Sequence, residues 1–317
     1  MDSITKLSEA KQEIQRVIIG QDDIIDMLFI ALLARGHVLL ESVPGSGKTQ
    51  LAKSFARVIE GDFNRIQFTP DVLPSDVTGI QFFNPKTQEF EWRIGPVQTN
   101  VLLADEINRA TPKTQSSLLE VMEEMQTTID GKTIAIEPPF FVMATQNPIE
   151  SSHGTFPLPE AQLDRFLFKV HMGYPDREAE KSILTTYRLQ EPLRELKPVL
   201  TAENILNFQQ KVRQINVSEA VTDYLLSLVE ATRHHPDIEL GISTRGALAL
   251  MRASQARAFI KGRTYVNPSD VKELAPYIFV HRLILTMEAS LQRNMEDLIE
   301  DVLGQVEVPV EAGEVEA

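Results

Sequence analysis

Short apolar runs recur through the first half of the chain, at residues 37–40, 63–68, 101–104, 140–145 and 166–170. Apolar runs of this length predict buried strands, and apolar residues at helical spacing predict helices between them. Strands and helices that alternate in this way predict an α/β fold with a mostly parallel, doubly wound sheet. In such a sheet, ligands bind beyond the carboxyl ends of the strands.

Two segments have the alternation of polar and apolar residues that is typical of hairpins. Residues 127–134 carry the turn dipeptide Asp130-Gly131 between β-favouring residues. Residues 80–94 alternate around a turn that contains Asn84 and Pro85. We expect both hairpins to be insertions in the core fold.

The strand pattern stops after the Gly-Tyr-Pro-Asp sequence at residues 173–176. Helical patterns then continue to about residue 303, and glutamates follow at 307, 311, 314 and 316. We therefore predict an α/β core over residues 1–172, an all-helical lid domain over 173–303 and a solvated acidic tail over 304–317. Ser218 and Ser243 are the expected N-caps of two lid helices.

The composition is that of a globular protein with a core, because 43% of the 317 residues are hydrophobic. We see neither a membrane span nor a secretory signal, and the chain has no cysteine, which excludes disulfides and thiolate metal sites. These features predict a cytoplasmic protein. The net charge of -14 makes nucleic acid an unlikely main partner.

Residues 42–49 carry the most specific motif of the chain. They lie between a predicted strand and a predicted helix, and they read Ser42, Val43, Pro44, Gly45, Ser46, Gly47, Lys48 and Thr49. Glycines at a helix N-terminus let backbone N–H groups surround a phosphate. In a phosphate-binding loop of this kind, Lys48 reaches the β- and γ-phosphates, and Thr49 holds Mg²⁺. Ser42 replaces the first glycine of the usual pattern.

Two carboxylates, Asp105 and Glu106, end the predicted strand at residues 101–104. Taken alone, such a pair most often caps the next helix. Downstream of a phosphate-binding loop, Asp105 is instead expected to hold Mg²⁺, and Glu106 to accept a proton from an attacking water or to orient that water.

Three more residues are candidates for contact with the phosphates. Asn147 ends the predicted strand at 140–145, although an Asn before a proline is often only a turn residue. Arg165 precedes the last strand, and Arg245 lies in the first turn of a helix. For either arginine taken singly, a surface salt bridge is the more common role.

These motifs resemble the AAA+ ATPases, and within them the MoxR family. The resemblance runs from about residue 18 to residue 282, and residues 103–110, 144–148 and 154–166 carry it most specifically. It implies a Walker A loop at 42–49, a Walker B pair at Asp105 and Glu106, and an adenine pocket lined by Gln21. The two hairpins resemble the helix-2 insert and the pre-sensor-1 insert of this branch.

The resemblance also implies roles for the remaining polar residues. Asn147 corresponds to sensor 1 and Arg245 to sensor 2. Arg165 corresponds to the arginine finger that a neighbouring subunit receives, and Arg109 is a rival candidate for that role.

The implied activity is hydrolysis of ATP with Mg²⁺ by a homo-oligomeric ring, with a hexamer expected. The implied purpose is chaperone-like maturation or activation of protein clients, among them proteins with a von Willebrand factor A domain. Two alternatives remain open from the sequence. One is a DNA-dependent AAA+ motor, because similar hairpins occur in helicases, and the other is a nucleotide-gated binding scaffold with negligible turnover.

Overall fold

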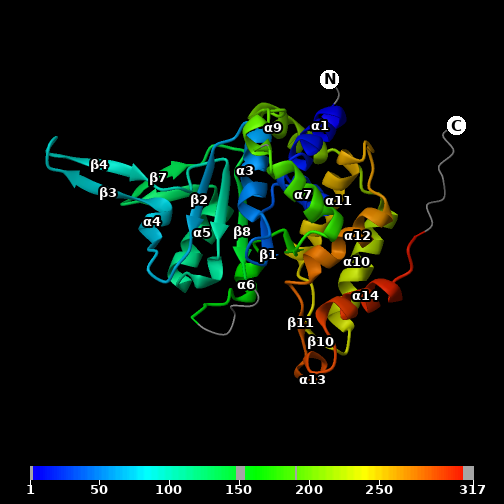
Figure 1. Ribbon diagram of the computed structural model, residues 1–317. Coiled ribbons are helices and arrows are strands. Elements are labelled where there is room, and N and C mark those ends of the chain that lie inside the picture. Colours follow the sequence, from blue (N-terminus) through cyan, green and yellow to red (C-terminus); the bar gives the residue numbers. More distant parts are fainter. Residues whose placement is uncertain (1–2, 148–153, 190, 310–317) are drawn as a thin grey trace. The chain divides into compact units, whose positions relative to one another are not determined.

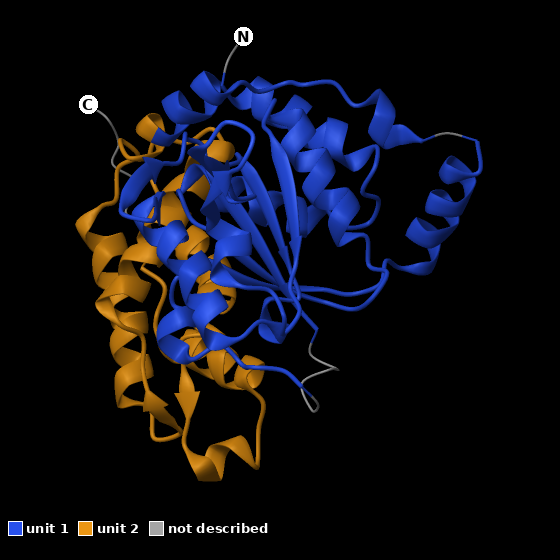
Figure 2. Cartoon of the chain, turned by 90° about the vertical axis from the view of Figure 1, so that its left-hand side faces the viewer, with its two compact units in different colours: residues 1–209 blue, residues 210–317 orange. Residues whose placement is uncertain are grey.

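A computed structural model describes residues 3–147, 154–189 and 191–309 of the chain. The chain forms two compact units, residues 1–209 and residues 210–317 (Figure 2). Of the predicted acidic tail, residues 310–317 lie outside the described residues. The two compact units divide between residues 209 and 210. The predicted boundary between core and lid, between residues 172 and 173, stays a prediction.

The first unit is built on a five-stranded parallel sheet with the strand order β2-β5-β8-β1-β9 (Figure 1). Its strands are β1 (Val38–Ser42), β2 (Phe63–Gln67), β5 (Val101–Asp105), β8 (Phe141–Gln146) and β9 (Phe168–Met172). Every strand matches one of the predicted apolar runs within two residues. The predicted doubly wound parallel sheet is therefore confirmed.

Helices connect these strands. The four longest helices that adjoin the sheet's strands in the chain are α2 (Asp22–Leu33), α3 (Lys48–Val58), α5 (Pro112–Glu124) and α7 (Arg177–Tyr187). Helix α1 (Ser3–Gln15) precedes them, and Gly20, with a φ of 75°, lies between α1 and α2. The shorter elements are η1 (Ile107–Arg109), α4 (Pro74–Thr78), α6 (Glu160–Leu163) and α8 (Pro192–Glu195), and α9 (Ala202–Val212) follows.

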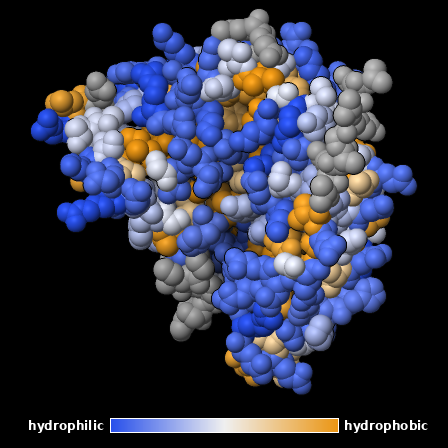
Figure 3. All heavy atoms as spheres, turned by 90° about the vertical axis from the view of Figure 1, so that its right-hand side faces the viewer, coloured by the Kyte–Doolittle hydropathy of each residue, from blue (hydrophilic) through white to orange (hydrophobic). Residues whose placement is uncertain are grey.

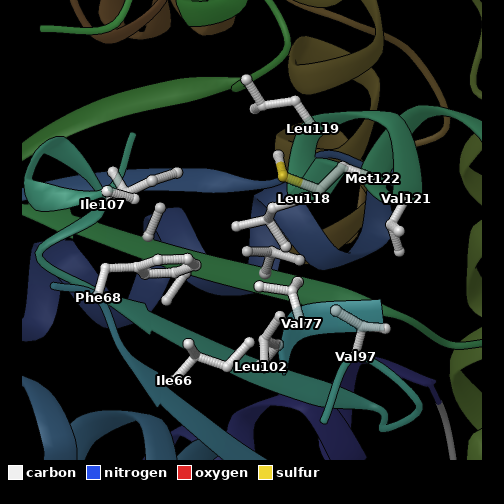
Figure 4. Packing of buried hydrophobic residues seen from close by; sticks show 14 of the residues in the cluster. Ile66, Phe68, Val77, Val97, Leu102, Ile107, Leu118, Leu119, Val121 and Met122 are labelled. Atoms are coloured by element: carbon white, nitrogen blue, oxygen red, sulfur yellow. The ribbon is translucent and has the colours of Figure 1, made fainter. Parts of the chain in front are cut away.

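The strands β1, β5 and β8 in the middle of the sheet are almost entirely buried. One apolar cluster joins the sheet to α4 and α5, and Phe68, Leu102 and Leu118 lie in it (Figure 4). Elsewhere in the first unit, the ring of Phe55 on α3 packs at 5.3 Å from the ring of Phe141 on β8. Burial on both faces explains why these three strands read as continuous apolar runs, whereas the edge strand β2 also has exposed polar residues.

Both predicted hairpins are confirmed. Strands β6 (Gln126–Ile129) and β7 (Lys132–Ala135) flank the Asp130-Gly131 turn, and β3 (Gly79–Asn84) pairs with β4 (Glu89–Ile94). The β3–β4 hairpin extends away from the central sheet (Figure 1). Its base is tightly packed, because a Cβ on Gly95 would lie 2.3 Å from the carbonyl oxygen of Val77.

The second unit contains the helices α10 (Glu219–His234), α11 (Thr244–Ile260), α12 (Pro268–Phe279) and α14 (Met295–Gln305). Ser218 and Ser243 accept N-cap hydrogen bonds from Val221 and Gly246, as predicted.

The expectation of helices alone needs one correction in this unit. Strand β10 (Ile238–Leu240) pairs with β11 (Ile284–Leu285), and α13 (Met287–Ser290) follows. Strands of three and two residues are too short to give a periodic signal in the sequence. Met287 and Leu291, which follow β11, are exposed. Figure 3 shows exposed apolar atoms at the lower end of the molecule, the end at which Figure 1 labels β10, β11 and α13.

Among the described residues, no helix is both long enough and apolar enough to cross a membrane.

Candidate nucleotide-binding site

The loop between β1 and α3 has the backbone of an anion site. Gly45 and Gly47 adopt φ angles of 80° and 90°, a left-handed conformation that favours glycine. A Cβ built on either residue would meet no atom within 4 Å, so space is open beside the loop. Ser42 is not among the residues with a positive φ, which explains why the usual glycine can be a serine here.

Lys48 and Asp105 form the centre of the site. The Nζ atom of Lys48 lies 2.8 Å from Oδ1 of Asp105, and the Asp105 side chain is only 1% exposed. Thr145 donates to the same oxygen at 2.6 Å, and Arg65 lies 2.7 Å from Oδ2. Burial alone would raise the pKa of Asp105, but hydrogen bonds from Lys48, Thr145 and Arg65 outweigh burial, so the pKa lies below its usual value.

Glu106 lies directly beyond the end of β5. Its φ of 58° is unusual for a glutamate, and its N–H donates to Oγ1 of Thr145 at 2.9 Å. This backbone conformation points the chain away from the strand. The carboxylate accepts hydrogen bonds from Gln67 at 2.9 Å and from Arg109 at 3.0 Å. The carboxylate of Glu106 therefore has different partners from that of Asp105, although Thr145 contacts both residues.

Asn147 follows β8, which is the sheet neighbour of β1. The register places Thr145 opposite Leu40 and Gln146 opposite Glu41. Asn147 is 5% exposed. The end of β8 therefore lies beside the strand that leads into the phosphate-binding loop, whereas a contact of Asn147 with a phosphate stays a prediction.

Gln21 lies at the start of α2, and its side-chain amide donates to the carbonyl oxygen of Gly173 at 3.2 Å. The hydroxyl of Tyr174 donates to the carbonyl oxygen of Pro44 in the phosphate-binding loop at 3.4 Å. Residues that follow β9 therefore contact both Gln21 and the loop. The sequence identified residues 173–176 only as a boundary and missed this contact.

The candidate arginines have different surroundings. Arg165 follows α6 and forms an ion pair with Glu123 on α5, with 2.8 Å between Nε and Oε2. Arg109 lies on η1 and contacts Glu106 of the same chain. Arg245 is exposed in the first turn of α11 and belongs to the second compact unit. An approach of Arg165 or Arg245 to a nucleotide stays a prediction.

No role was predicted for Arg65, Gln67 and Thr145, which contact the two acids. The available signal for the first two is their spacing, because polar residues at i and i+2 near the end of β2 lie on one side of the strand. Thr145 was counted only as part of an apolar run. A polar residue near the end of an otherwise apolar strand indicates a contact with the end of a neighbouring strand.

The groups at this site fit a nucleotide that carries a metal ion. The open loop with its two left-handed glycines suits a phosphate, and Ser46 has a buried hydroxyl for which the described residues provide no partner. No cluster of three or more His, Cys, Asp or Glu side chains that could hold a metal occurs in the described part of the chain. Mg²⁺ commonly needs only one or two protein oxygens beside phosphates and water, and Thr49 and Asp105 could supply them.

Comparisons with known proteins agree with this geometry. Residues 37–168 match the model of the ATPase family associated with various cellular activities, and residues 230–302 match the AAA lid domain. Chaperone MoxR1 of Mycobacterium tuberculosis is 43% identical over 96% of this chain and 82% of its own length. The YeaC protein of Bacillus subtilis is 48% identical over 98% of this chain and 97% of its own. A crystal structure of a Cytophaga hutchinsonii protein assigned as an ATPase is 39% identical, with a TM-score of 0.90 over 97% of this chain and 96% of its own.

Proposed function

Because the chain belongs to the MoxR family of AAA+ ATPases, we propose that it hydrolyses ATP with Mg²⁺ to drive the maturation or activation of protein partners. The ion pair between Lys48 and the buried Asp105 is the observation that carries the proposal, since it joins the phosphate-binding loop to the end of β5. This contact supports the proposal because Lys48 is expected to bind the phosphates and Asp105 the metal ion.

In this proposal, backbone N–H groups of residues 43–48 and the Lys48 ammonium bind the phosphates. Thr49 and Asp105 hold Mg²⁺, which neutralises charge on the phosphate oxygens when it is bound. Glu106 takes the proton of the attacking water, and Asn147 donates a hydrogen bond that orients this water. The water oxygen bonds to the γ-phosphorus, and the bond between the γ-phosphorus and the oxygen that bridges it to the β-phosphate breaks, which leaves ADP and phosphate.

We also propose that the active form is a homo-oligomeric ring, with a hexamer expected. A neighbouring subunit then receives Arg165, and Arg245 contacts the nucleotide of its own chain. The Arg165–Glu123 ion pair is partly exposed, with side-chain exposures of 29% and 37%, so an exchange of partners costs little. Proteins with a von Willebrand factor A domain are one class of client to test.

The β3–β4 hairpin favours protein over DNA as the partner. Phe83 and Phe90 on it are 52% and 65% exposed. Its charged residues include Lys86 and Arg93 but also Glu89 and Glu91, so the hairpin carries no net positive charge. A DNA-binding element is expected to be basic, because phosphate neutralisation supplies most of the affinity.

The test is a measurement of phosphate release over a range of protein concentrations, with and without duplex DNA. We expect turnover that needs Lys48 and Glu106 and that DNA does not stimulate. Stimulation by DNA supports the motor instead, and absence of turnover at high protein concentration supports the scaffold. Affinity capture with a Glu106→Gln variant in the presence of ATP then identifies the clients.

A further inference from the structure

A continuous series of hydrogen bonds joins the two acids at the end of β5 by way of β2. Arg65 donates from Nε and Nη2 to Oδ2 of Asp105, at 3.2 and 2.7 Å. The same Nη2 donates to Oε1 of Gln67 at 2.6 Å. Gln67 in turn donates from Nε2 to Oε2 of Glu106 at 2.9 Å. Arg65 and Gln67 thus link the expected metal ligand to the expected base.

The backbone holds these groups in register. Strand β2 pairs with β5 and places Gln67 opposite Asp105, and the N–H of Phe68 donates to the carbonyl oxygen of Asp105 at 2.9 Å. In the strand order, β2 lies on the side of β5 that is opposite to β8 and β1. The arginine therefore approaches Asp105 from the side that faces away from the phosphate-binding loop.

The carboxylate of Asp105 contacts two cationic side chains, one at each oxygen. Its Oδ1 contacts Lys48 and Thr145, and its Oδ2 contacts Arg65. A metal ion near this carboxylate meets the positive charge of the guanidinium, and like charges at short range repel. A metal ion and Arg65 therefore compete for the charge of Asp105. Any shift of Arg65 also changes its hydrogen bond with Gln67.

We propose that Arg65 is a positioning residue that couples occupation of the metal site at Asp105 to the orientation of Glu106, with Gln67 as the intermediate. The inference rests on the proposed function, since it takes Asp105 as a metal ligand and Glu106 as the base. Arginine suits this role because its planar group donates to two acceptors at once, which a lysine ammonium on a flexible stem does not reproduce.

The first experiment measures nucleotide binding without turnover. A fluorescent ATP analogue that is not hydrolysed is held at a fixed concentration, and Mg²⁺ is titrated. We expect Arg65→Gln to lower the Mg²⁺ concentration at half-saturation by roughly two- to fivefold, because one competing cation is lost. Gln67→Ala is expected to raise it, because Arg65 then donates to Asp105 alone. Since coupling between sites is reciprocal, an effect of Gln67 on metal binding reports the link.

The matched control is Asn64→Ala. Asn64 lies on the same strand, but its side chain donates to the carbonyl oxygen of Pro96 at 2.9 Å and contacts neither acid in the described structure. Its Mg²⁺ dependence should equal that of the wild type. Identical half-saturation in the wild type, Arg65→Gln and Gln67→Ala would overturn the inference while leaving the proposed function intact. Absence of nucleotide binding by the wild type itself would overturn both.

The second experiment uses steady-state kinetics. Arg65→Lys keeps a positive charge at Asp105, so it should fold and bind nucleotide, but it loses the hydrogen bond that Nη2 donates to Gln67. We expect Arg65→Lys and Gln67→Ala to lower kcat with little change in KM. The double variant should be no slower than the slower single variant, because both changes break the same link. Additive losses, or full activity of Arg65→Lys, would show that the two residues act independently.

Discussion

The ammonium group of Lys48, the first residue of α3, lies 2.8 Å from the carboxylate of Asp105, the last residue of β5. In the sheet, β8 lies between β5 and β1, so this contact reaches across the end of a strand. This ion pair therefore joins the two ends of the proposed site. In the proposed function, Lys48 also binds phosphate oxygens.

The proposed roles of Lys48 and Glu106 predict different defects when each residue is substituted. Lys48→Ala should abolish nucleotide binding, because the lysine meets the phosphates in the ground state. Glu106→Gln should keep binding and lose hydrolysis by about 10²–10⁴-fold, because the amide keeps the shape of the side chain and cannot accept the proton. Titration of a fluorescent ATP analogue and an assay of phosphate release separate the two effects. Equal loss of binding in both variants would contradict the assigned roles.

Buried His37 predicts a pH dependence of stability. Burial lowers its pKa from 6.5 to about 4. The neutral ring fits its surroundings, since Nδ1 accepts from the N–H of Val142 at 3.1 Å and Nε2 lies 3.3 Å from the carbonyl oxygen of Met122. In the unfolded chain, the ring binds a proton below pH 6.5. The stabilisation is therefore complete above pH 6.5 and is lost as the pH falls toward 4, by an amount of order 3 kcal/mol.

Urea unfolding at several pH values between 7 and 4 tests this expectation. His37→Gln keeps a polar side chain and removes the titration, so its unfolding free energy should fall less steeply over this range. The variant is expected to be less stable than the wild type at pH 7, and the difference should shrink as the pH falls. Parallel curves for the two proteins would assign the pH dependence to other groups.

The exposed aromatic pair of the β3–β4 hairpin predicts a separation of activity from client binding. The rings of Phe83 and Phe90 pack against each other at 5.5 Å between centroids, on neighbouring strands. They pack little against the rest of the first unit, since about half or more of each residue is exposed. Replacing both with alanine should therefore leave the fold and basal ATP hydrolysis unchanged and should reduce capture of client proteins.

Met287 and Leu291 provide the matched control for this change. They are 82% and 84% exposed, and they lie in the second unit, near the β10–β11 ribbon. Alanine at both positions removes a similar amount of exposed apolar surface. Equal loss of client capture in the two double variants would show that capture depends on general surface apolarity and not on the hairpin.

The sequence predicted β1, β5 and β8 closely because these central strands are almost entirely buried, so their residues form apolar runs. It predicted the β6–β7 hairpin because Asp130 and Gly131 adopt positive φ angles of 46° and 82°, which few other dipeptides favour. It could not predict the β10–β11 ribbon, because two or three residues carry no period. The candidate residues near the phosphates were found because the loop and the strand ends have local signatures.

The contacts among those residues needed the structure. The pairing of β2 with β5 is a long-range feature, and it alone brings Arg65 and Gln67 to the acids. The left-handed backbone of Glu106 could not be foreseen either, since glutamate rarely adopts that conformation. The contact of Arg109 with Glu106 follows from that conformation, and it gives Arg109 a partner within its own chain.

The final prediction concerns which arginine completes a neighbour's site. If Arg165 acts on the next subunit, an Arg165→Ala subunit keeps a functional phosphate-binding loop. It lacks only the arginine that completes the site of its neighbour. A Lys48→Ala subunit has a phosphate-binding loop that does not bind ATP, but it can still contribute its Arg165 to the site of a neighbour. Each variant alone should be inactive, since arginines supplied in this way contribute on the order of 10³-fold or more to the rate.

Mixing the two variants in equal amounts should restore activity. Half of the subunits then carry an intact loop, and half of their neighbours supply the arginine, so random mixed rings should recover up to about a quarter of the wild-type rate. The release of Arg165 from Glu123 is part of this expectation, and Glu123→Gln should not reduce the recovery. Size-exclusion chromatography with differently tagged subunits confirms that mixed rings form.

Arg245 provides the contrasting case. If it contacts the nucleotide of its own chain, an Arg245→Ala subunit and a Lys48→Ala subunit each have a damaged site that no neighbour can repair. A mixture of these two variants should therefore recover no activity. Recovery with Arg245→Ala, or none with Arg165→Ala in confirmed mixed rings, would reverse the two roles or move the finger to Arg109. In the latter case, Arg109 would have to leave Glu106 of its own chain, from which it now lies 3.0 Å away.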